Sequence, residues 1–467
     1  MKQKVHFGYL LFLSFVAAWG GFLFGYDEAV ISGTISEVSA QFNLNDGMKG
    51  WFVSSALLGA IIGVIFGGAL GDNIGRKKTM ILSAVLFTVS MIGCAISNSF
   101  IELVLYRIVG GMGIGLASIV CPLYISEISV PQHRGLLVSL YQLAVTIGVV
   151  AAYIINDQLL SLAQEGEALG NFFDKIFITE YWRGMLGMGV IPSMFFLIIV
   201  LCIPESPRWL ITKGRVSRAE NIFGRIYCSK EDVGAQIAAT QEVSKPSGSE
   251  KSEIKMLFQP GIFKALIIGM AIAILGQFMG VNAVLYYGPE IFKGAGLASD
   301  DALFYQVIVG LANMITTILA MFIIDKIGRK KLIYYGVSGM IISLLLIAAY
   351  FIWGEALNIS SYYLLVFFVL YIVCCAGSIC AVVWVILSEM YPIKVRAVAM
   401  SIASFALWIG TFLIGQLTPW LLTNITPQGT FLLFAVCCVP YMLIMWKAVP
   451  ETTGKSLEEI EKYWTKK

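Results

Sequence analysis

Three short sequence patterns occur twice in this chain, and the two copies of each lie half a chain length apart. The repeated patterns are Asp72-Asn73-Ile74-Gly75-Arg76-Lys77-Lys78 with Asp325-Lys326-Ile327-Gly328-Arg329-Lys330-Lys331, Ser126-Glu127 and Arg134 with Ser388-Glu389 and Arg396, and Pro204-Glu205-Ser206-Pro207 with Pro450-Glu451-Thr452-Thr453. Both copies run in the same order and lie beside long apolar segments. The chain is therefore a tandem duplication, and its fold must consist of two similar halves.

The composition places the chain in a membrane. Hydrophobic residues make up 58% of the chain and charged residues 13%, which leaves too little polar surface for a soluble protein. Apolar stretches long enough to cross about 30 Å of hydrocarbon as helices lie near residues 8–33, 50–71, 79–97, 101–125, 136–156 and 184–203, and again near 262–290, 302–324, 332–353, 362–388, 397–421 and 430–448. The predicted fold class is an all-α membrane protein with twelve transmembrane helices in two six-helix bundles. Two halves with an even number of spans share one orientation, which is how parallel repeats build a transporter around a central site.

The basic residues predict the orientation of these spans. Lys and Arg are concentrated in every second loop, whereas the loops between them carry only Lys49, Lys175, Arg183 and Lys293. By the positive-inside rule both termini are cytoplasmic, and we expect a multi-pass protein of the cell (inner) membrane. The net charge of +3 is explained by this topology, so it indicates no nucleic-acid partner.

The duplication and the polar segments divide the chain into four parts. We expect an N-terminal six-helix bundle (1–204), a cytoplasmic linker with short helices (205–260), a C-terminal six-helix bundle (261–449) and a cytoplasmic tail (450–467). In the linker, 217–227 and 231–241 read as short helices, and the linker has too little apolar sequence for its own core. The N-terminus, with Lys2 and Lys4 before an apolar run, has features of a signal peptide. The run continues to Asp27, however, so we expect it to remain as the first span.

Two ionisable residues, Asp27 and Arg107, lie inside apolar spans. A charge in hydrocarbon costs at least a few kcal/mol, so such residues persist only with a partner or a function. At 1.5 Å per residue, Asp27 lies about 13 Å from the outer end of the first span and Arg107 about 9 Å from the outer end of the fourth, so the two can meet. One interpretation is a permanent salt bridge. The other is a proton switch, in which Asp27 is protonated as the pocket closes and Arg107 is released.

The duplicated charged motifs predict a latch at the cytoplasmic ends of the spans. The predicted latch residues are Asp72, Arg76, Glu127, Arg134, Asp325, Arg329, Glu389 and Arg396. The Asp of each copy can accept hydrogen bonds from N–H groups at the start of the next helix, and the Arg of each copy can reach an acid such as Glu389 or Glu127. The alternative is that these charges only set the topology, although topology needs no Asp or Gly at a fixed spacing. The sequence contains no metal-ligand cluster, nucleophile triad or phosphate-binding loop, so we expect neither an enzyme nor a cofactor.

Several motifs carry a family resemblance over almost the whole chain. They are Phe24-Gly25-Tyr26-Asp27, Asp-x-x-Gly-Arg-Lys in both halves, Pro204-Glu205-Ser206-Pro207-Arg208-Trp209-Leu210, Gln277-Phe278-Met279-Gly280-Val281-Asn282 followed by Leu285-Tyr286-Tyr287, and Pro450-Glu451-Thr452-Thr453-Gly454-Lys455. In this ordered set the chain resembles the sugar porter family of the major facilitator superfamily, and within it the bacterial D-xylose/proton symporters. The resemblance implies that Asp27 is the proton site, since facilitative relatives carry Asn there, and that Phe24 belongs to the sugar site.

A sugar site needs neutral hydrogen-bonding groups beside aromatic rings, because a sugar carries hydroxyl groups and apolar C–H faces but no charge. The candidates within the predicted spans are the amides Gln142, Gln277, Asn282 and Asn313 and the aromatic residues Trp384 and Trp408. The resemblance supports Gln142, Gln277, Asn282 and Trp384 as sugar-binding residues. For each amide the alternative is a hydrogen bond between helices, worth about 0.6 kcal/mol.

The seventh predicted span is longer than one crossing and is interrupted by Gly276, Gly280, Gly288 and Pro289. Local bending there would carry Tyr286 and the tyrosine that follows it over the pocket. The resemblance implies that this segment is an extracellular gate and that Tyr286 contacts the sugar. Simple packing of small residues is the alternative.

Four positions depart from the pattern of the sugar porter family and leave the identity of the sugar open. Gly276 replaces the first Gln of a Gln-Gln pair, Val149 replaces a Gln, and Leu407 replaces a Gln or Asn. Cys380-Ala381 replaces a Gly-Pro, which removes an expected bend in the tenth span. Fewer hydroxyl contacts remain than in the xylose symporters.

Together these observations predict a proton-coupled symporter that imports a monosaccharide, a pentose or a hexose, as its halves rock about a central site. The expected partners are the sugar, the proton and the lipid bilayer, with no cofactor, metal or nucleic acid, and we expect a monomer. One alternative is a facilitative sugar uniporter in which Asp27 is structural. The other is a sugar sensor that does not transport, although the tail after Pro450 is short for a signalling domain.

Overall fold

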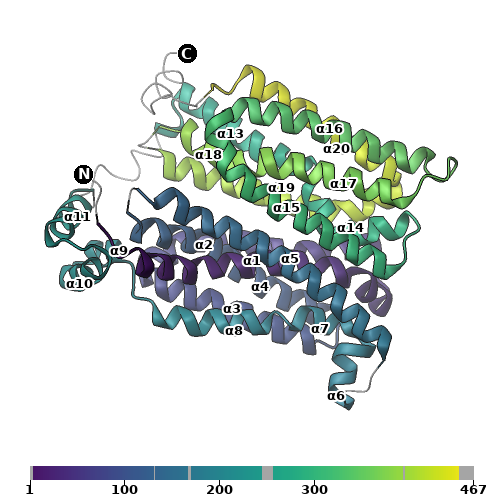
Figure 1. Ribbon diagram of the computed structural model, residues 1–467, viewed down its shortest axis with the longest axis horizontal. Coiled ribbons are helices and arrows are strands. Elements are labelled where there is room, and N and C mark those ends of the chain that lie inside the picture. Colours follow the sequence, from purple (N-terminus) through teal and green to yellow (C-terminus); the bar gives the residue numbers. More distant parts are fainter. Residues whose placement is uncertain (1–3, 131, 167–169, 244–255, 393–394, 452–467) are drawn as a thin grey trace. The chain divides into compact units, whose positions relative to one another are not determined.

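The computed structural model describes residues 4–130, 132–166, 170–243, 256–392 and 395–451, without the side chains of Asn171, Phe172, Glu242, Val243, Asp325 and Ala397. Within these ranges the chain is helical apart from its connections and one isolated bridge between Val5 and Tyr227 (Figure 1). The prediction of an all-α membrane protein is thereby confirmed.

Within the described residues, 12 helical segments are long and apolar enough to cross a membrane, as the hydropathy pattern predicts. In the first half they are α1 (Phe7–Phe42), α2 (Asp46–Ile74), α3 (Arg76–Ile96), α4 (Phe100–Ile128), α5 (Arg134–Glu165), and α7 (Tyr181–Gly187) with α8 (Val190–Cys202). In the second half they are α13 (Pro260–Phe278) with α14 (Val281–Gly294), α15 (Ser299–Ile327), α16 (Arg329–Trp353), α17 (Ser361–Cys375) with η2 (Ala376–Cys380) and α18 (Ala381–Met390), α19 (Arg396–Asn424), and α20 (Thr426–Lys447).

The other described helical segments are short. They are α6 (Asn171–Asp174), the π-helical η1 (Lys175–Thr179), α9 (Pro207–Thr212), α10 (Val216–Ile226) and α11 (Lys230–Val243). The last two match the linker helices predicted from the sequence. They lie beside the start of α1 at the left of Figure 1, where the backbone N–H of His6 donates to the carbonyl oxygen of Ile226 at 2.9 Å.

Backbone contacts divide the chain into two compact units. Unit 1 comprises Met1–Val30, Ser55–Ile155 and Leu162–Ser247, and unit 2 comprises Ile31–Ser54, Asn156–Ser161 and Gly248–Lys467. The C-terminal end of α1 and the N-terminal end of α2 therefore belong to unit 2. The two six-helix bundles expected from the sequence halves stay a prediction.

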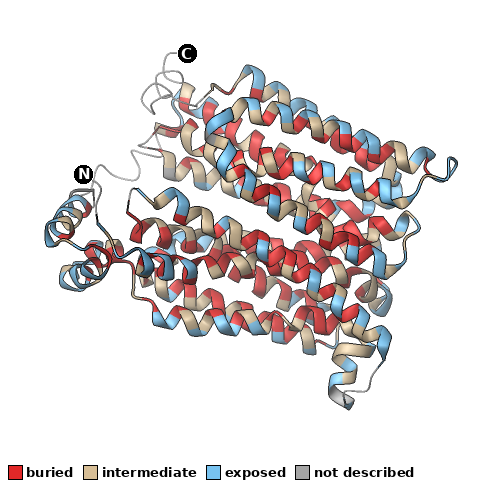
Figure 2. Ribbon diagram, viewed as in Figure 1, coloured by how far each residue is buried: buried red, intermediate tan, exposed pale blue. Residues whose placement is uncertain are grey.

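In unit 1, α2 and α4 approach so closely that some contact positions admit only glycine. A Cβ atom on Gly59 would lie 2.1 Å from the carbonyl oxygen of Ile108, and one on Gly111 would lie 1.9 Å from that of Ala56. Small residues let membrane helices pack backbone against backbone in this way. The helix faces that meet one another are buried (Figure 2), whereas apolar side chains such as Ile101, which is 72% exposed, face outward as lipid contact requires.

Two spans of unit 2 are irregular. Gly280 has φ 92° and separates α13 from α14, in agreement with the interruption predicted for the seventh span. Residues other than glycine rarely adopt this backbone conformation. In the tenth span, Ala376–Cys380 forms a π-helical turn. The expectation that Cys380-Ala381 gives a more regular span is therefore corrected, because this π turn distorts the helix without a proline.

The duplicated charged motif has the same backbone geometry in both copies. Gly75, between α2 and α3, has φ 103° and ψ 159°, and Gly328, between α15 and α16, has φ 93° and ψ 152°. This region is accessible essentially only to glycine. The recurrence of Gly in the two motifs thus follows from the sharp connection that each one makes.

Candidate functional site

Asp27 on α1 and Arg107 on α4 form an ion pair inside unit 1. Nη1 of Arg107 lies 3.3 Å from Oδ1 of Asp27, and each side chain is 2% exposed. The depths estimated from the sequence thus place the two residues beside one another. Among the described residues, Oδ2 of Asp27 has no hydrogen-bond partner. The carboxylate therefore has one long contact and one oxygen that can receive a proton.

The surroundings of this ion pair are weakly polar. A Cβ atom on Gly110 would lie 2.4 Å from Oγ of Ser90 and 3.8 Å from Oδ1 of Asp27, so glycine makes room for the pair. Cys94 on α3 is 1% exposed and lies within electrostatic reach of both charges. In such an apolar setting the charge of Asp27 depends on Arg107, because the loss of Arg107 would leave this carboxylate buried and uncompensated.

In unit 2, Gln277 and Asn282 lie on either side of the helix break at Gly280 and bond to each other. Nδ2 of Asn282 donates to Oε1 of Gln277 at 2.8 Å. Oγ1 of Thr411 on α19 lies 3.2 Å from the same oxygen and 3.0 Å from the carbonyl oxygen of Leu407, so its one proton is shared between these two acceptors. Gly410 permits this approach, since a Cβ atom there would lie 3.2 Å from Cβ of Gln277. Both amides are half-buried, and Thr411 is 3% exposed. Broken helices of this kind carry the substrate sites of many secondary transporters.

The other candidates of unit 2 lie at different depths. Trp408 on α19 and Tyr286 on α14 are buried, with 6% and 2% of their surface exposed. Asn313 on α15 is half-buried, and Trp384 on α18 is 39% exposed. Trp384 thus offers the most accessible of these aromatic faces, which is what stacking on a sugar ring requires.

Gln142 and Phe24 are the candidates from unit 1. Gln142 lies on α5 and is exposed, and Phe24 lies on α1 and is half-buried. An amide exposed within a membrane span finds its partners in a water-filled cavity, since lipid offers none. The exposure of Gln142 therefore agrees with a place on a cavity wall.

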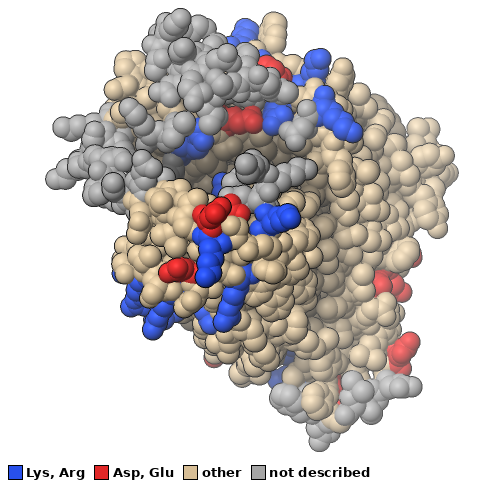
Figure 3. All heavy atoms as spheres, turned by 60° about the vertical axis from the view of Figure 1, so that its left-hand side comes forward, with Lys and Arg blue, Asp and Glu red and all other residues tan. Residues whose placement is uncertain are grey.

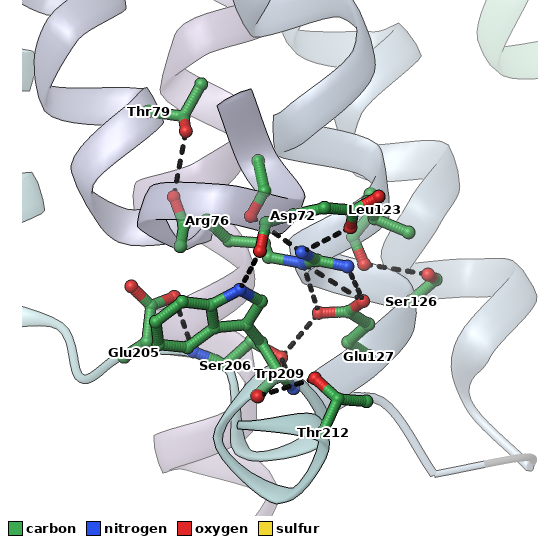
Figure 4. Close-up of polar contacts among 12 residues, drawn as sticks. Asp72, Arg76, Thr79, Leu123, Ser126, Glu127, Glu205, Ser206, Trp209 and Thr212 are labelled. Carbon is green, nitrogen blue, oxygen red and sulfur yellow. Dashed lines mark hydrogen bonds and ion pairs between the residues drawn. The ribbon is translucent and has the colours of Figure 1, made fainter. Parts of the chain in front are cut away.

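Arg76 forms a charged cluster with the buried Glu127 and the exposed Asp72 at the ends of α2, α3 and α4 (Figure 4). Its guanidinium donates to Glu127 from Nε and Nη2 at 2.9 to 3.2 Å and to Asp72 from Nη1 at 2.8 Å. Glu127 also accepts from the hydroxyl of Ser206, which precedes α9, and Nε1 of Trp209 donates to the carbonyl oxygen of Asp72 at 2.8 Å. These charge-assisted bonds tie α2, α3, α4 and α9 together.

The prediction that Asp72 accepts hydrogen bonds from the N–H groups at the start of α3 was wrong. The backbone N–H of Lys77 donates to Oε1 of Glu205 at 3.0 Å and not to Asp72, whose carboxylate is engaged by Arg76 one helical turn away. In the second copy, the N–H of Lys330 donates to Oε2 of Glu451 at 3.3 Å. A carboxylate at a helix N-terminus is favourable because it meets unpaired N–H groups. The repeated Pro-Glu dipeptides were the signal for these two acids.

In the second copy of the motif, Nη2 of Arg329 donates to Oε1 of Glu389 at 3.1 Å. Arg76 likewise pairs with Glu127, so each Arg reaches the acid of its own sequence half. The side chain of Asp325 lies outside the described residues. The latch that these groups are expected to form stays a prediction.

Arg134 and Arg396, the last pair of predicted latch residues, differ in their hydrogen bonds. Nε and Nη2 of Arg396 donate to the carbonyl oxygen of Tyr391 at 3.3 and 3.2 Å, whereas Nε of Arg134 has no partner within the described ranges. Figure 3 looks at the end of unit 1 that carries α9, α10 and α11. Lys, Arg, Asp and Glu side chains gather there, while the flank in this view is mostly uncharged.

One set of polar contacts in unit 2 was not predicted. Oγ of Ser54 donates to Oε1 of Gln416 at 2.7 Å, and Nε2 of Gln416 donates to the carbonyl oxygen of Gly47 at 2.9 Å. Nζ of Lys293 donates to Oγ of Ser36 at 3.2 Å. These bonds hold the end of α1 and the start of α2 against α14 and α19. The sequence did contain a signal for these contacts, because Gln416 is an amide within an apolar span.

The cysteines are further candidate ligands. All nine are free, and Sγ of Cys375 lies 3.7 Å from Sγ of Cys380 across the π turn. Among the described residues no group of three or more His, Cys, Asp or Glu side chains is arranged to hold a metal ion.

Comparison with known proteins identifies the family. A family model described as "Sugar (and other) transporter" matches residues 13–464. The arabinose-proton symporter of Bacillus subtilis is 37% identical over 98% of this chain and 96% of its own length. The D-xylose-proton symporter of Escherichia coli K12 is 35% identical over 99% of this chain and 97% of its own length. The inward-open structure of the xylose transporter XylE from E. coli superposes with a TM-score of 0.80 at 33% identity, over 98% of this chain and 100% of that one. The predicted resemblance is therefore confirmed, and the chain belongs to the sugar transporter family of the major facilitator superfamily.

Proposed function

We propose that this carrier is a symporter that imports a monosaccharide together with a proton. The observation that supports this most strongly is the buried pair of Asp27 and Arg107. A proton on Oδ2 of Asp27 removes its negative charge, weakens the 3.3 Å contact and releases Arg107. The arabinose- and D-xylose-proton symporters among the relatives support the same coupling.

The hydrogen-bonded cluster of Gln277, Asn282 and Thr411 supports a sugar site at the break between α13 and α14. Neutral donors and acceptors suit a pentose or a hexose, which has hydroxyl groups but no charge. The remaining residues proposed for this site are Phe24, Gln142, Tyr286, Asn313, Trp384 and Trp408. The proton and the sugar thus have separate sites on a carrier that performs no chemical reaction and needs no cofactor.

The charged side chains at the end of unit 1 near α9, α10 and α11 support an orientation (Figure 3). The positive-inside rule makes this end cytoplasmic, together with both termini, in a protein of the inner membrane. The end where Gln416 bonds to Ser54 and Gly47 is then extracellular, so these bonds close the outer side. We propose that the bundles 1–204 and 261–449, joined by 205–260, rock about the sugar within a single monomer.

The transport cycle follows from these parts. Sugar binds at Gln277 and Asn282 while the outer side is open, and a proton binds Asp27. Both then leave on the cytoplasmic side, where the Arg76 and Arg329 clusters loosen and re-form. Return of the empty carrier requires the ion pair of Asp27 and Arg107, which keeps a deprotonated carrier from carrying an unpaired charge through the closed state.

Uptake by proteoliposomes tests this proposal. The purified carrier would be offered a panel of labelled pentoses and hexoses, with and without an inward proton gradient, and with a protonophore as the control. A symporter concentrates at least one sugar only when the outside is acidic. Uptake that ignores the gradient would establish the uniporter, and an absence of uptake for every sugar, with binding retained, would leave the sensor.

A further inference from the structure

Pro289 lies inside α14 and leaves a gap in the helical hydrogen bonds. A helical carbonyl oxygen normally accepts from the N–H four residues later, but proline has no N–H, so the oxygen of Leu285 lacks its usual donor. In a membrane such a group must be satisfied by a neighbouring side chain or water. The site of the gap matters, because it lies where the seventh span is expected to gate the outer side.

Gln306 on α15 supplies the missing donor. Its Nε2 donates to the carbonyl oxygen of Leu285 at 3.1 Å and to that of Val284 at 3.3 Å. The residue is 1% exposed, so water does not compete for these bonds. Glycine at position 288 is what admits this side chain, since a Cβ atom on Gly288 would lie 2.0 Å from Oε1 of Gln306.

A second proline gap faces the same segment. Pro419 lies inside α19, so the carbonyl oxygen of Gly415 also lacks its usual donor. Oη of Tyr287 donates to this oxygen at 2.6 Å, and Tyr287 is fully buried. Tyr287 stands between Leu285 and Pro289 in α14, so the segment held by Gln306 is the one that presents this tyrosine to α19.

We propose that Gln306 is a positioning residue for the outer gate. It replaces the N–H that Pro289 lacks, holds α14 at the kink, and so keeps Tyr287 on the carbonyl oxygen of Gly415 while the outer side is closed. On opening, the end of α14 moves and Tyr287 exchanges this carbonyl oxygen for water, while Gln306 keeps its two carbonyl partners as the pivot. This role rests on the proposed alternating-access transport of a sugar.

A double-mutant cycle between Gln306→Leu and Pro289→Ala tests the proposal. Gln306→Leu removes both hydrogen bonds that this side chain donates to α14, so the rate of uptake should fall about ten-fold and amide hydrogen exchange across 284–294 should quicken. Alanine at 289 restores the N–H, so Gln306→Leu in that background should have little further effect on either measurement. Gln306→Met, which keeps the unbranched shape, should behave like Gln306→Leu and provides a second variant if the first does not fold.

The matched control is Ser343→Ala on α16. Ser343 is also fully buried, but its hydroxyl bonds within its own regular helix, to the carbonyl oxygen of Gly339 at 2.8 Å. Its loss should not be coupled to Pro289. Equal losses from Gln306→Leu with Pro or Ala at 289 would overturn the role of Gln306. Wild-type carrier that moves no sugar would instead overturn the proposed function, so the two failures are distinguishable.

Discussion

Oε1 of Gln277 accepts a 2.8 Å hydrogen bond from Nδ2 of Asn282 across the helix break at Gly280. The hydroxyl of Thr411, which shares its proton between this oxygen and the carbonyl oxygen of Leu407, supports the orientation that Asn282 gives to Gln277, with Nε2 of Gln277 left as a donor. A fixed donor favours an acceptor on the ligand, such as the oxygen of a sugar hydroxyl group. The site is thus ordered before the sugar arrives, which reduces the entropy lost on binding.

Gln277→Ala should weaken sugar binding by about 1 to 3 kcal/mol, because a hydroxyl group of the bound sugar loses its partner. The fold should survive, since Gln277 is only half-buried. Titration calorimetry on the purified, monodisperse variant measures the change. Unaltered affinity would remove Gln277 from the site.

Thr411→Val should weaken sugar binding by about 1 kcal/mol, because it keeps the shape of the side chain but removes the hydroxyl that orients Gln277. Thr411→Ser keeps the hydroxyl and is the matched control, with affinity close to that of the wild type. Calorimetry with the same sugar compares the two. If valine and serine give equal affinities, Thr411 does not position Gln277.

Arg76→Gln should loosen the cytoplasmic closure without changing the sugar site. The substitution breaks the bonds to Glu127 and Asp72 and shifts the carrier toward inward-open forms. Cysteine labelling at cytoplasmic cavity positions reports the shift, and Lys78→Gln, an exposed basic residue of the same motif, is the control. Equal labelling rates in both variants and in the wild type would leave these charges as topology signals.

Gly75→Ala should destabilise the carrier by about 1 to 3 kcal/mol, because φ 103° is strained for alanine. The added Cβ atom would also lie 2.2 Å from Oε2 of Glu205. Gly68→Ala on α2 is the control, since no atom lies within 4 Å of its added Cβ. Thermal unfolding in detergent compares the variants, and equal melting temperatures would show that the connection adapts to alanine.

Much of this structure could be predicted from the repeated motifs and from the positions of charged residues along the spans. The duplication predicted equivalent structural roles for Gly75 and Gly328. Their backbone angles agree within about 10°. Depth along a helix also sufficed to bring Asp27 to Arg107, because both spans are long regular helices whose residues rise by a constant step.

The sequence could not show which of two similar side chains forms a given hydrogen bond. Asp72 and Glu205 both lie near the start of α3, and only the fold shows that Glu205 accepts from the backbone N–H of Lys77. Thr411 carried no signal either, since its hydroxyl also has an acceptor in its own helix, the carbonyl oxygen of Leu407 at 3.0 Å, as Ser14 has in Leu10. The π turn at Ala376–Cys380 was missed because it contains no proline and is set by packing.

Proton coupling through Asp27 is the central claim. Asn keeps the shape of this side chain but cannot bind and release a proton, so Asp27→Asn separates coupling from binding. Sugar binding and downhill exchange of labelled sugar should remain, because exchange does not require the proton site to empty.

The decisive measurement is the accumulation of labelled sugar by proteoliposomes carrying wild-type or Asp27→Asn protein, with an acidic exterior. We predict that the wild type concentrates the sugar above its external level, whereas Asp27→Asn only equilibrates it. Accumulation by Asp27→Asn equal to that of the wild type would show that Asp27 is not the coupling residue and that its pairing with Arg107 is a permanent salt bridge.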